Sequence, residues 1–428
     1  MKNIIKSVSV LAALTSLAFA GDEPKDLKKV IEDQGIYVET AKPGIVLSGY
    51  VDAGYSYDFN GAGAVGTRAA TDGNTSGRGS NFNLNAFKLA LEKPLSTKNE
   101  FSAGFRADLI YGDDASALAG TNATGALNPA TTSSNNLLLE QAFVQLNAPV
   151  GNGINFKVGK FVTPLGYEVI ERPSNQNITY GNLFVNTIPL YHTGVLASYK
   201  VNDIIDVKGG VVNGANSDQQ TGTAFGGAGG GTPNGVGLLG TVNVTAPGGN
   251  ANIQQGVFIA LNSNATSNTG LLATPSEAPL WVYDIWGQWK PKFNSNLTLG
   301  FNGDFGEGTQ YLAGLSNNTT FEGAAVYAKY QFTKIFSLAT RTDWLHTDNG
   351  GKFTPDGYAG ANDIYSFTAT GSFDVFENTL LRAEYRADYG SEGISAGGGN
   401  LPAGAPFGTA PVSKGPAQLI DLEIVYSF

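Results

Sequence analysis

The stretch Gln418–Phe428, QLIDLEIVYSF, decides the fold because one face is wholly apolar or aromatic and the other is mostly polar. The apolar or aromatic members are every second residue, namely Ile420, Leu422, Ile424, Tyr426 and Phe428. Strand side chains point to opposite faces in turn, so this stripe occupies one face, and Asp421 and Glu423 lie on the other. The chain ends on the stripe, with an aromatic residue last. Strands with one apolar and one polar face cross a bilayer as a closed barrel, so the stretch predicts a transmembrane β-strand.

The composition favours one large all-β unit over several soluble domains. Among 428 residues, 57 are Gly and one is Met, while 11% are aromatic and 14% are charged, a profile poor in helix formers and rich in strand and turn residues. After residues 1–20 there is no run of about eighteen apolar residues, which excludes a helical membrane protein. The chain has no Cys, so disulfides and thiolate metal sites are excluded.

Residues 1–20 have the three parts of a secretory signal. Lys2 and Lys6 form a basic start, Val8–Phe19 form an apolar core, and Ala18-Phe19-Ala20 form a cleavage site. Removing the two lysines changes the formal net charge from −10 to −12. This acidity argues against nucleic acid as a partner.

Alternation of the same kind recurs through residues 45–428, and residues 21–44 are interpreted as a periplasmic N-terminal lead-in. Long polar loops such as residues 112–136 follow one end of the strands, and short turns such as Pro149–Gly153 follow the other end. Up-and-down outer-membrane barrels show that asymmetry, with long external loops and short periplasmic turns. The sequence therefore predicts an all-β, antiparallel transmembrane β-barrel.

The predicted number of strands depends on residues 213–279. If the alternating runs within Val236–Leu261 form a hairpin, the barrel has about sixteen strands, and without that hairpin it has about fourteen. Both numbers are even, so the first and last strands lie side by side in opposite directions and the sheet can close. We favour sixteen because two runs of membrane-crossing length flank the short turn Pro247–Gly249. Within Phe82–Leu91 the apolar stripe changes phase, which predicts a β-bulge near Ala86.

Charged residues gather on the phase opposite the apolar stripes. A charge on the lipid face costs roughly 2–4 kcal/mol near the middle of the bilayer, which enforces this phase. Two interpretations stand: the charges form the wet or ion-paired interior of a β-protein, or they set the field of an aqueous pore, which sixteen strands are wide enough to enclose. Both signs occur, so no strong ion selectivity is predicted. The predicted pore-lining residues are Arg106, Asp108, Asp206, Lys208, Arg341, Asp343, Arg382, Glu384, Arg386 and Asp388.

The segment 161–192, FVTPLGYEVIERPSNQNITYGNLFVNTIPLYH, differs from the other loops. It contains three prolines, few glycines and several aromatic residues, and a loop so apolar is expected to pack against another part of the protein. We predict that it folds into the lumen and narrows it; an external cap and an oligomer contact are the alternatives. The residues predicted near the constriction are Tyr167, Glu168, Glu171, Arg172 and Tyr180.

No catalytic residue, metal site or cofactor is predicted. His346 has Asp343 and Asp348 nearby in sequence, and a histidine and an acid can form an acid-base pair of the kind found in outer-membrane proteases. A lone loop histidine such as His192 is more often structural. Asp113-Asp114 would offer oxygen ligands to a hard cation, but the EF-hand spacing is missing.

Three tryptophans lie close together at Trp281, Trp286 and Trp289. Tryptophan is enriched where a membrane protein meets the lipid–water interface. We predict that at least some of the three belong to an aromatic girdle at the membrane boundary, with an oligomer interface as the alternative.

With these residues laid out, the chain resembles the OmpL-like β-barrel porins of Gram-negative bacteria, the porin-2 group, from about Leu47 to Phe428. The stretches that carry the resemblance are LALEKP (Leu89–Pro94), VGKFVTPLGYEVIERP (Val158–Pro173), IPLYHTGV (Ile188–Val195), VVNGANSD (Val211–Asp218) and LRAEYRADYG (Leu381–Gly390). The glycine-rich residues 222–237 depart from the pattern. The resemblance implies pore activity without catalytic residues, and it implies that the terminal strand, with Tyr426 and Phe428, is recognised by the outer-membrane assembly machinery.

These patterns lead to one functional hypothesis and two alternatives. We expect an exported porin of the cell outer membrane, with a water-filled channel for passive diffusion of ions and small hydrophilic solutes. Outer-membrane lipid, the assembly machinery and these solutes are the expected partners, together with a homo-oligomer as an option. The alternatives are a plugged surface barrel that binds or adheres through its long external loops, and a soluble secreted β-protein.

Overall fold

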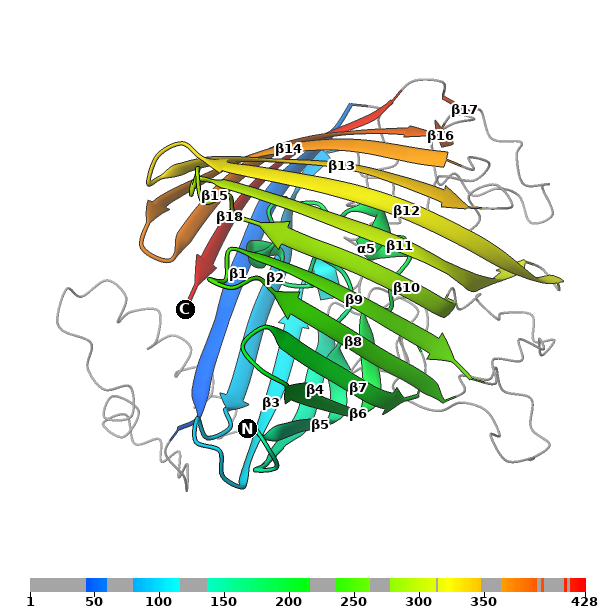
Figure 1. Cartoon of the computed structure of the whole chain (residues 1–428). Coiled ribbons are helices and arrows are strands. Elements are labelled where there is room, and N and C mark those ends of the chain that lie inside the picture. Colours follow the sequence, from blue (N-terminus) through cyan, green and yellow to red (C-terminus); the bar gives the residue numbers. More distant parts are fainter. Residues whose placement is uncertain are drawn as a thin grey trace, which may run out of the picture. The chain divides into compact units, whose positions relative to one another are not determined.

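The alternating stretches form strands, and the strands close into one antiparallel barrel (Figure 1). The computed structural model describes residues 44–59, 80–115, 137–213, 215, 236–261, 278–312, 315–347, 363–390, 394–395, 412–413 and 416–428. The expected signal segment, and all of the lead-in except its last residue, lie outside these ranges. Within the described residues, no helix is long and apolar enough to cross a membrane.

Sixteen strands make up the barrel, and two shorter strands pair separately. The barrel strands are β1 (Val46–Asp58), β2 (Ser80–Lys93), β3 (Ser102–Tyr111), β4 (Leu137–Ala148), β5 (Ile154–Val162), β6 (Tyr191–Lys200), β7 (Ile205–Val212), β8 (Gly237–Thr245), β9 (Ala251–Ala260), β10 (Ala278–Trp289), β11 (Leu297–Leu312), β12 (Leu315–Gln331), β13 (Phe336–Thr347), β14 (Asp363–Phe376), β15 (Thr379–Gly390) and β18 (Ala417–Ser427). The separate pair is β16 (Ile394–Ser395) with β17 (Val412–Ser413). The predicted hairpin at residues 236–261 is present as β8 and β9, so the prediction of sixteen strands is confirmed.

The first and last barrel strands lie side by side and close the sheet. Their register pairs Tyr50 with Ser427 and Ser56 with Asp421. Beyond this ladder, the Gly49 N–H donates to the Phe428 carbonyl and the Phe428 N–H donates to the Gly49 carbonyl, both at 2.9 Å. Each barrel strand therefore has two hydrogen-bonded neighbours, and the barrel has no open edge.

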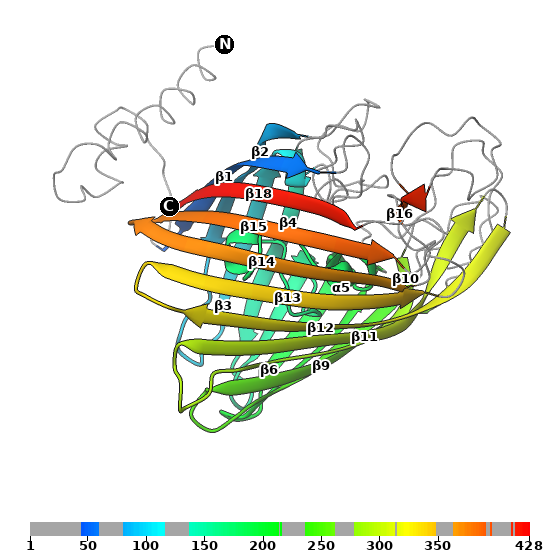
Figure 2. The same ribbon diagram turned by 90° about the horizontal axis from the view of Figure 1, so that it is seen from above.

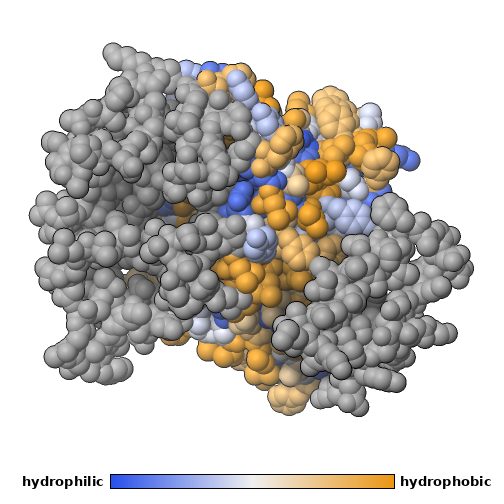
Figure 3. Space-filling view, turned by 180° about the vertical axis from the view of Figure 1, so that it is seen from behind, coloured by the Kyte–Doolittle hydropathy of each residue, from blue (hydrophilic) through white to orange (hydrophobic). Residues whose placement is uncertain are grey.

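The two faces of the strands differ as the alternation predicts. On β18, Leu422 and Ile424 are 47% and 49% exposed on the outer surface, whereas Asp421 and Glu423 are buried inside. Figure 3 shows one side of the molecule, where hydrophobic residues make up most of the described surface. This outer surface suits a hydrocarbon environment.

The predicted β-bulge lies in β2. Opposite β1, Asp52 pairs with Ala86 while the next residue, Ala53, pairs with Leu84, which leaves Asn85 as the extra residue. Because of this extra residue, the apolar side chains before and after the bulge all point to the outer face. The Asn85 side chain points inward and donates to Asp52 Oδ1 at 2.6 Å.

The structure separates the three tryptophans of β10. Trp281 and Trp289 face outward near opposite ends of the strand, and they pack against Phe305 and Phe293, at ring-centroid distances of 5.3 and 6.1 Å. These two suit an aromatic girdle. Trp286 occupies the inward phase instead, with its ring 6.0 Å from that of Tyr167.

A charge on the outer face should destabilise the barrel much more than the same charge on a turn. Val326 on β12 and Val150 in the turn after β4 are both 59% exposed. We expect Val326→Arg to lower the free energy of unfolding by about 2–4 kcal/mol in lipid vesicles, because the position faces the apolar band. Val150→Arg serves as the matched control and should have little effect, as measured by urea unfolding. Equal losses for both variants would contradict the assignment of the outer face.

Candidate functional site

The segment between β5 and β6 lies inside the barrel, as Figures 1 and 2 show by the position of α5 (Asn182–Asn186). A second short helical turn, η1 (Arg172–Ser174), precedes it. The segment contacts other strands soon after it leaves β5, because the Gly166 N–H donates to Asp284 on β10 and the Tyr167 N–H donates to Asn302 on β11, both at 3.0 Å. These contacts agree with the prediction that the segment enters the lumen.

Arg341 on β13 connects the segment to the wall through several hydrogen bonds. It is fully buried. Its guanidinium group donates to Glu168 on the segment at 2.7 Å and to Asp343 on its own strand at 3.0 Å. It also donates to the backbone carbonyl of Thr179 at 2.6 Å. Planar guanidinium groups suit such multiple contacts, so Arg341 joins two turns of the segment to the wall.

Three charged side chains of β15 hold the middle of the segment. Arg382 pairs with Glu423 of β18 at 2.5 Å and donates to the Arg172 carbonyl at 3.1 Å. Glu384 accepts the backbone N–H groups of residues 178 and 179, at 2.6 and 3.0 Å. Arg386 pairs with Asp388 at 2.9 Å and donates to the carbonyl of residue 180 at 2.6 Å. The wall therefore satisfies backbone groups of the segment that water would otherwise have to satisfy.

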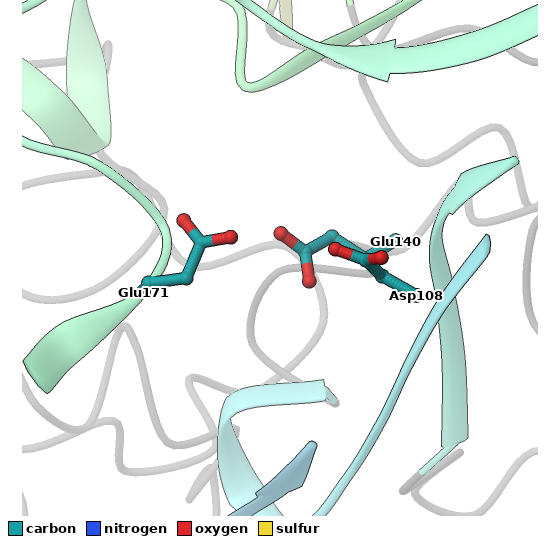
Figure 4. A group of neighbouring side chains, drawn as sticks. All are labelled: Asp108, Glu140 and Glu171. Carbon is teal, nitrogen blue, oxygen red and sulfur yellow. The ribbon is translucent and has the colours of Figure 1, made fainter. Parts of the chain in front are cut away.

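A second cluster, on β2, β3 and β4, binds the segment through Glu171. The Lys88 ammonium on β2 lies 2.6 Å from Glu171, 2.8 Å from Glu140 and 3.2 Å from Asp108. Figure 4 shows the three carboxylates pointing toward one another from β3, β4 and the segment. Their spacing resembles a metal site, but the ammonium of Lys88 contacts all three groups and supplies the cation.

Apolar packing completes the attachment of the segment. Tyr180 and Phe184 stack at 4.5 Å and are buried together with Ile170 and Ile188. Burial raises the pKa of Tyr180 well above its ordinary value, so the phenol stays protonated and donates to the Ile170 carbonyl. The interior of the barrel is therefore partly a dry core.

The ten predicted pore-lining residues fall into two groups. Seven are buried to 3% exposure or less, namely Asp108, Arg341, Asp343, Arg382, Glu384, Arg386 and Asp388. The other three, Arg106, Asp206 and Lys208, keep partial exposure on β3 and β7. All ten lie on inward phases, and the buried seven contact the segment, each other or neighbouring wall residues.

The five residues predicted near the constriction all belong to the interior part of the segment. Glu168, Arg172 and Tyr180 are at most 6% exposed. Arg172 pairs with Asp114, with contacts of 2.6 and 2.7 Å. Tyr167 and Glu171 are half-buried. All five thus contact their surroundings, and Tyr167 and Glu171 also keep an accessible surface.

The acid-base arrangement considered for His346 takes a different form. The imidazole Nδ1 lies 2.9 Å from Asp363, which also accepts the indole N–H of Trp344 at 2.9 Å. Asp343 faces the interior and pairs with Arg341, and Asp348 lies outside the described residues. His346, Trp344 and Asp363 thus form a hydrogen-bonded group on the outer face of β13 and β14.

Several interior residues were missed by the sequence analysis. Lys88, Glu140, Asp284 and Asp304 are all buried and contact the segment or its anchors. A usable signal existed, because each is a charged residue on the polar phase of an alternating strand. The sequence alone did not show which residues these four side chains contact.

Removing Arg341 should destabilise the protein strongly, because Glu168 and Asp343 would remain buried without their cation. We expect Arg341→Met to lower the free energy of unfolding by about 3–5 kcal/mol in urea titrations. The control is Lys200→Met, since Lys200 and its partner Asp203 are 61% and 97% exposed on a turn. That exposed pair is screened by water, so the control should unfold like the parent protein.

Comparison with known proteins places this barrel among porins. A family model described as "Putative beta-barrel porin-2, OmpL-like" matches residues 44–412. No curated protein sequence matches the chain.

Solved structures share the fold at low sequence identity. The outer membrane channel DcaP of Acinetobacter baumannii is 13% identical, with 92% of this chain and 99% of that chain covered and a TM-score of 0.57. The anion-selective porin from Comamonas acidovorans is 11% identical, with coverages of 90% and 99% and a TM-score of 0.55. The trimer form of OmpT, an outer membrane protein of Vibrio cholerae, is 11% identical, with the same coverages and a TM-score of 0.51.

The family model covers well over half of the chain, from the start of β1 to β17. The closed barrel of sixteen antiparallel strands agrees with it. The chain therefore belongs to the OmpL-like β-barrel porin-2 family.

Proposed function

We propose that this porin forms a water-filled channel in the cell outer membrane for passive diffusion of ions and small hydrophilic solutes. The observation that carries the proposal is the closed barrel of sixteen strands with an apolar outer face and polar inward positions. Barrels of this strand number enclose more space than their wall side chains fill. Transport of this kind needs no cofactor, metal or catalytic residue.

The water path in this proposal runs past half-buried inward residues near the short turns. They are Glu92, Arg106, Lys157, Asp206 and Lys208. Arg106 and Glu92 pair at 3.3 Å, with side-chain exposures of 30% and 32%. Because both signs are present along this wall, the proposal includes only weak ion selectivity.

The segment 161–192 would set the narrowest part of that path. It leaves β5, contacts β10 and β11 first, and then contacts β13, β2 and β15 in turn. Tyr167 and Glu171 keep accessible surface. These two would therefore face the solutes, while Glu168, Arg172 and Tyr180 would hold the constriction in shape.

Shortening the segment should widen the channel. We expect deletion of Gly166–Asn182 to raise the single-channel conductance, because it removes the interior residues and leaves the wall charges solvated by water. Deletion of residues 222–235, in the glycine-rich stretch between β7 and β8, is the control of comparable length and should change conductance less. An unchanged conductance after the first deletion would contradict the constriction.

A plugged barrel that binds partners at the cell surface is the second candidate. The observation that favours it is the burial of the segment inside the barrel, with Ile178, Tyr180 and Leu183 at 1% exposure or less. The two candidates differ in liposome swelling, because a small neutral sugar enters vesicles through an open channel only. Absence of swelling with the parent protein, and swelling with the deletion of Gly166–Asn182, would support the plug.

Export and assembly complete the proposal. Residues 1–20 would be removed as a signal peptide, and the terminal strand would be recognised by the assembly machinery through Tyr426 and Phe428. Both side chains face outward and are 43% and 46% exposed. The trimer form of a structural neighbour supports a homo-oligomer as the working assembly.

Deletion of Phe428 should impair assembly much more than conduction. The residue makes both backbone hydrogen bonds to Gly49 at the closing seam, and its side chain is 46% exposed. We expect less folded protein in the outer membrane, measured as the heat-modifiable band on gels, and ordinary single-channel conductance of the molecules that insert. Ordinary membrane levels combined with altered pore current would contradict this role.

A further inference from the structure

Aromatic rings of the interior segment and of the wall come together over β10, β11 and β12. The Tyr167 ring lies 6.0 Å from the Trp286 ring on β10 and 4.3 Å from the Tyr327 ring on β12, measured between centroids. Gly300 on β11 has no side chain, and a Cβ atom there would lie 2.6 Å from Tyr167 Cζ. The glycine therefore lets the ring lie directly on the wall. Together the three rings form one aromatic surface, which we call the aromatic platform.

Hydrogen bonds fix the orientation of the platform. The Tyr167 phenol accepts a hydrogen bond from Gln176 Nε2 at 2.7 Å and donates to Gln288 Oε1 at 3.4 Å. Tyr167 and Trp286 are half-buried. Because both side chains lie inside the barrel, their accessible surface faces the lumen. A solute that passes this part of the wall therefore meets two aromatic side chains that are held in place.

Polar groups that remain free to bind a ligand lie beside the platform. Gln288 is half-buried, and its Nε2 has no hydrogen-bond partner among the described residues. In the strand register, Asn252 of β9 lies opposite Gln288 on one side and Gly300 of β11 lies opposite it on the other. Thr298, two residues before Gly300, is also inward and half-buried. Amide and hydroxyl groups both donate and accept hydrogen bonds, so this edge of the platform can bind a ligand that does the same.

The charges around the platform disfavour a cationic ligand. Aromatic rings bind cations well, but a cation site also needs accessible carboxylates nearby. The carboxylates at described inward positions of β10 and β11 are Asp284 and Asp304, which are at most 4% exposed and contact the interior segment instead. Lys329 on β12 is half-buried and repels cations. The half-buried charges of the water path belong to other strands, namely β2, β3, β5 and β7.

We propose that the aromatic platform and its polar edge form a binding site for a neutral sugar inside the channel. This inference rests on the proposed channel function. One face of a pyranose ring consists largely of C–H groups, which pack on aromatic rings, and its rim carries hydroxyl groups, which bond to amides. Trp286 and Tyr167 match the face, while Gln288, Asn252 and Thr298 match the rim. Weak binding at such a site favours entry of the sugar and still permits its release.

Ion conductance in the presence of maltose tests the proposal. A bound disaccharide obstructs ions, so we expect the conductance of the parent protein to fall to a plateau as maltose is added. Sorbitol, a polyol without a ring, should produce no such plateau. Trp286→Leu should raise the half-saturating maltose concentration about tenfold, which is the loss expected for one ring contact. Trp289→Leu, on the outward phase of the same strand, is the matched control and should keep the parent value. Absence of a plateau, or equal values for Trp286→Leu and the parent, would overturn the proposal.

Tryptophan fluorescence gives a readout that does not depend on conduction. Maltose should change the emission of the full-length protein in detergent, and Trp286→Leu should remove that change while Trp289→Leu keeps it. Gln288→Leu should weaken binding and leave all tryptophans in place, which separates the polar edge from the rings. An emission change that persists in Trp286→Leu would refute the site.

The same titration separates the two proposals from each other. Choline, a cationic ligand of aromatic rings, should not change the emission, and an effect of choline without an effect of maltose would contradict a sugar site. If the parent protein conducts no ions, the proposed channel function fails. The fluorescence titration then still decides whether the platform binds maltose.

Discussion

The closure of the sheet between β1 and β18 is the constraint on which the rest of this structure depends. Hydrocarbon offers no partner for a backbone N–H or C=O, so a strand that crosses the membrane must have a neighbour on each side. β1 and β18 become neighbours through the pairing of Tyr50 with Ser427 and through two hydrogen bonds between Gly49 and Phe428. Closure also fixes the inward phase of every strand, and the inward phases then determine what can meet inside the barrel.

Inside the barrel, the main role of the buried charged side chains is to hold the interior segment against the wall. Arg341, Arg382 and Arg386 each combine a carboxylate partner with backbone carbonyls of the interior segment. Paired charges of this kind largely cancel each other's field at a distance, so charges with partial exposure, such as Lys208, matter more to a passing ion. Breaking one buried pair leaves a partner unneutralised, which gives these residues their strong effect on stability.

Part of the fold and of the candidate site follows from local pattern. The strand count, the bulge in β2 and the closing pair all follow from alternation with a period of two, because that period assigns a face to every side chain. The interior position of residues 161–192 follows from their apolar composition. The cluster of Lys88 with Glu140 and Glu171 did not follow, because it depends on contacts with a segment far away in the chain.

The sequence by itself determined that the chain is a transmembrane barrel and which side chains face lipid, since alternation and chain-length arguments are local. Only the tertiary structure decided which inward charges are neutralised and which keep contact with water. Glu384 meets residues 178 and 179, and Asp304 meets Thr187, across more than a hundred positions of sequence. Strand register and barrel closure bring such distant partners together. A periodic pattern in the sequence gives no information about either of them.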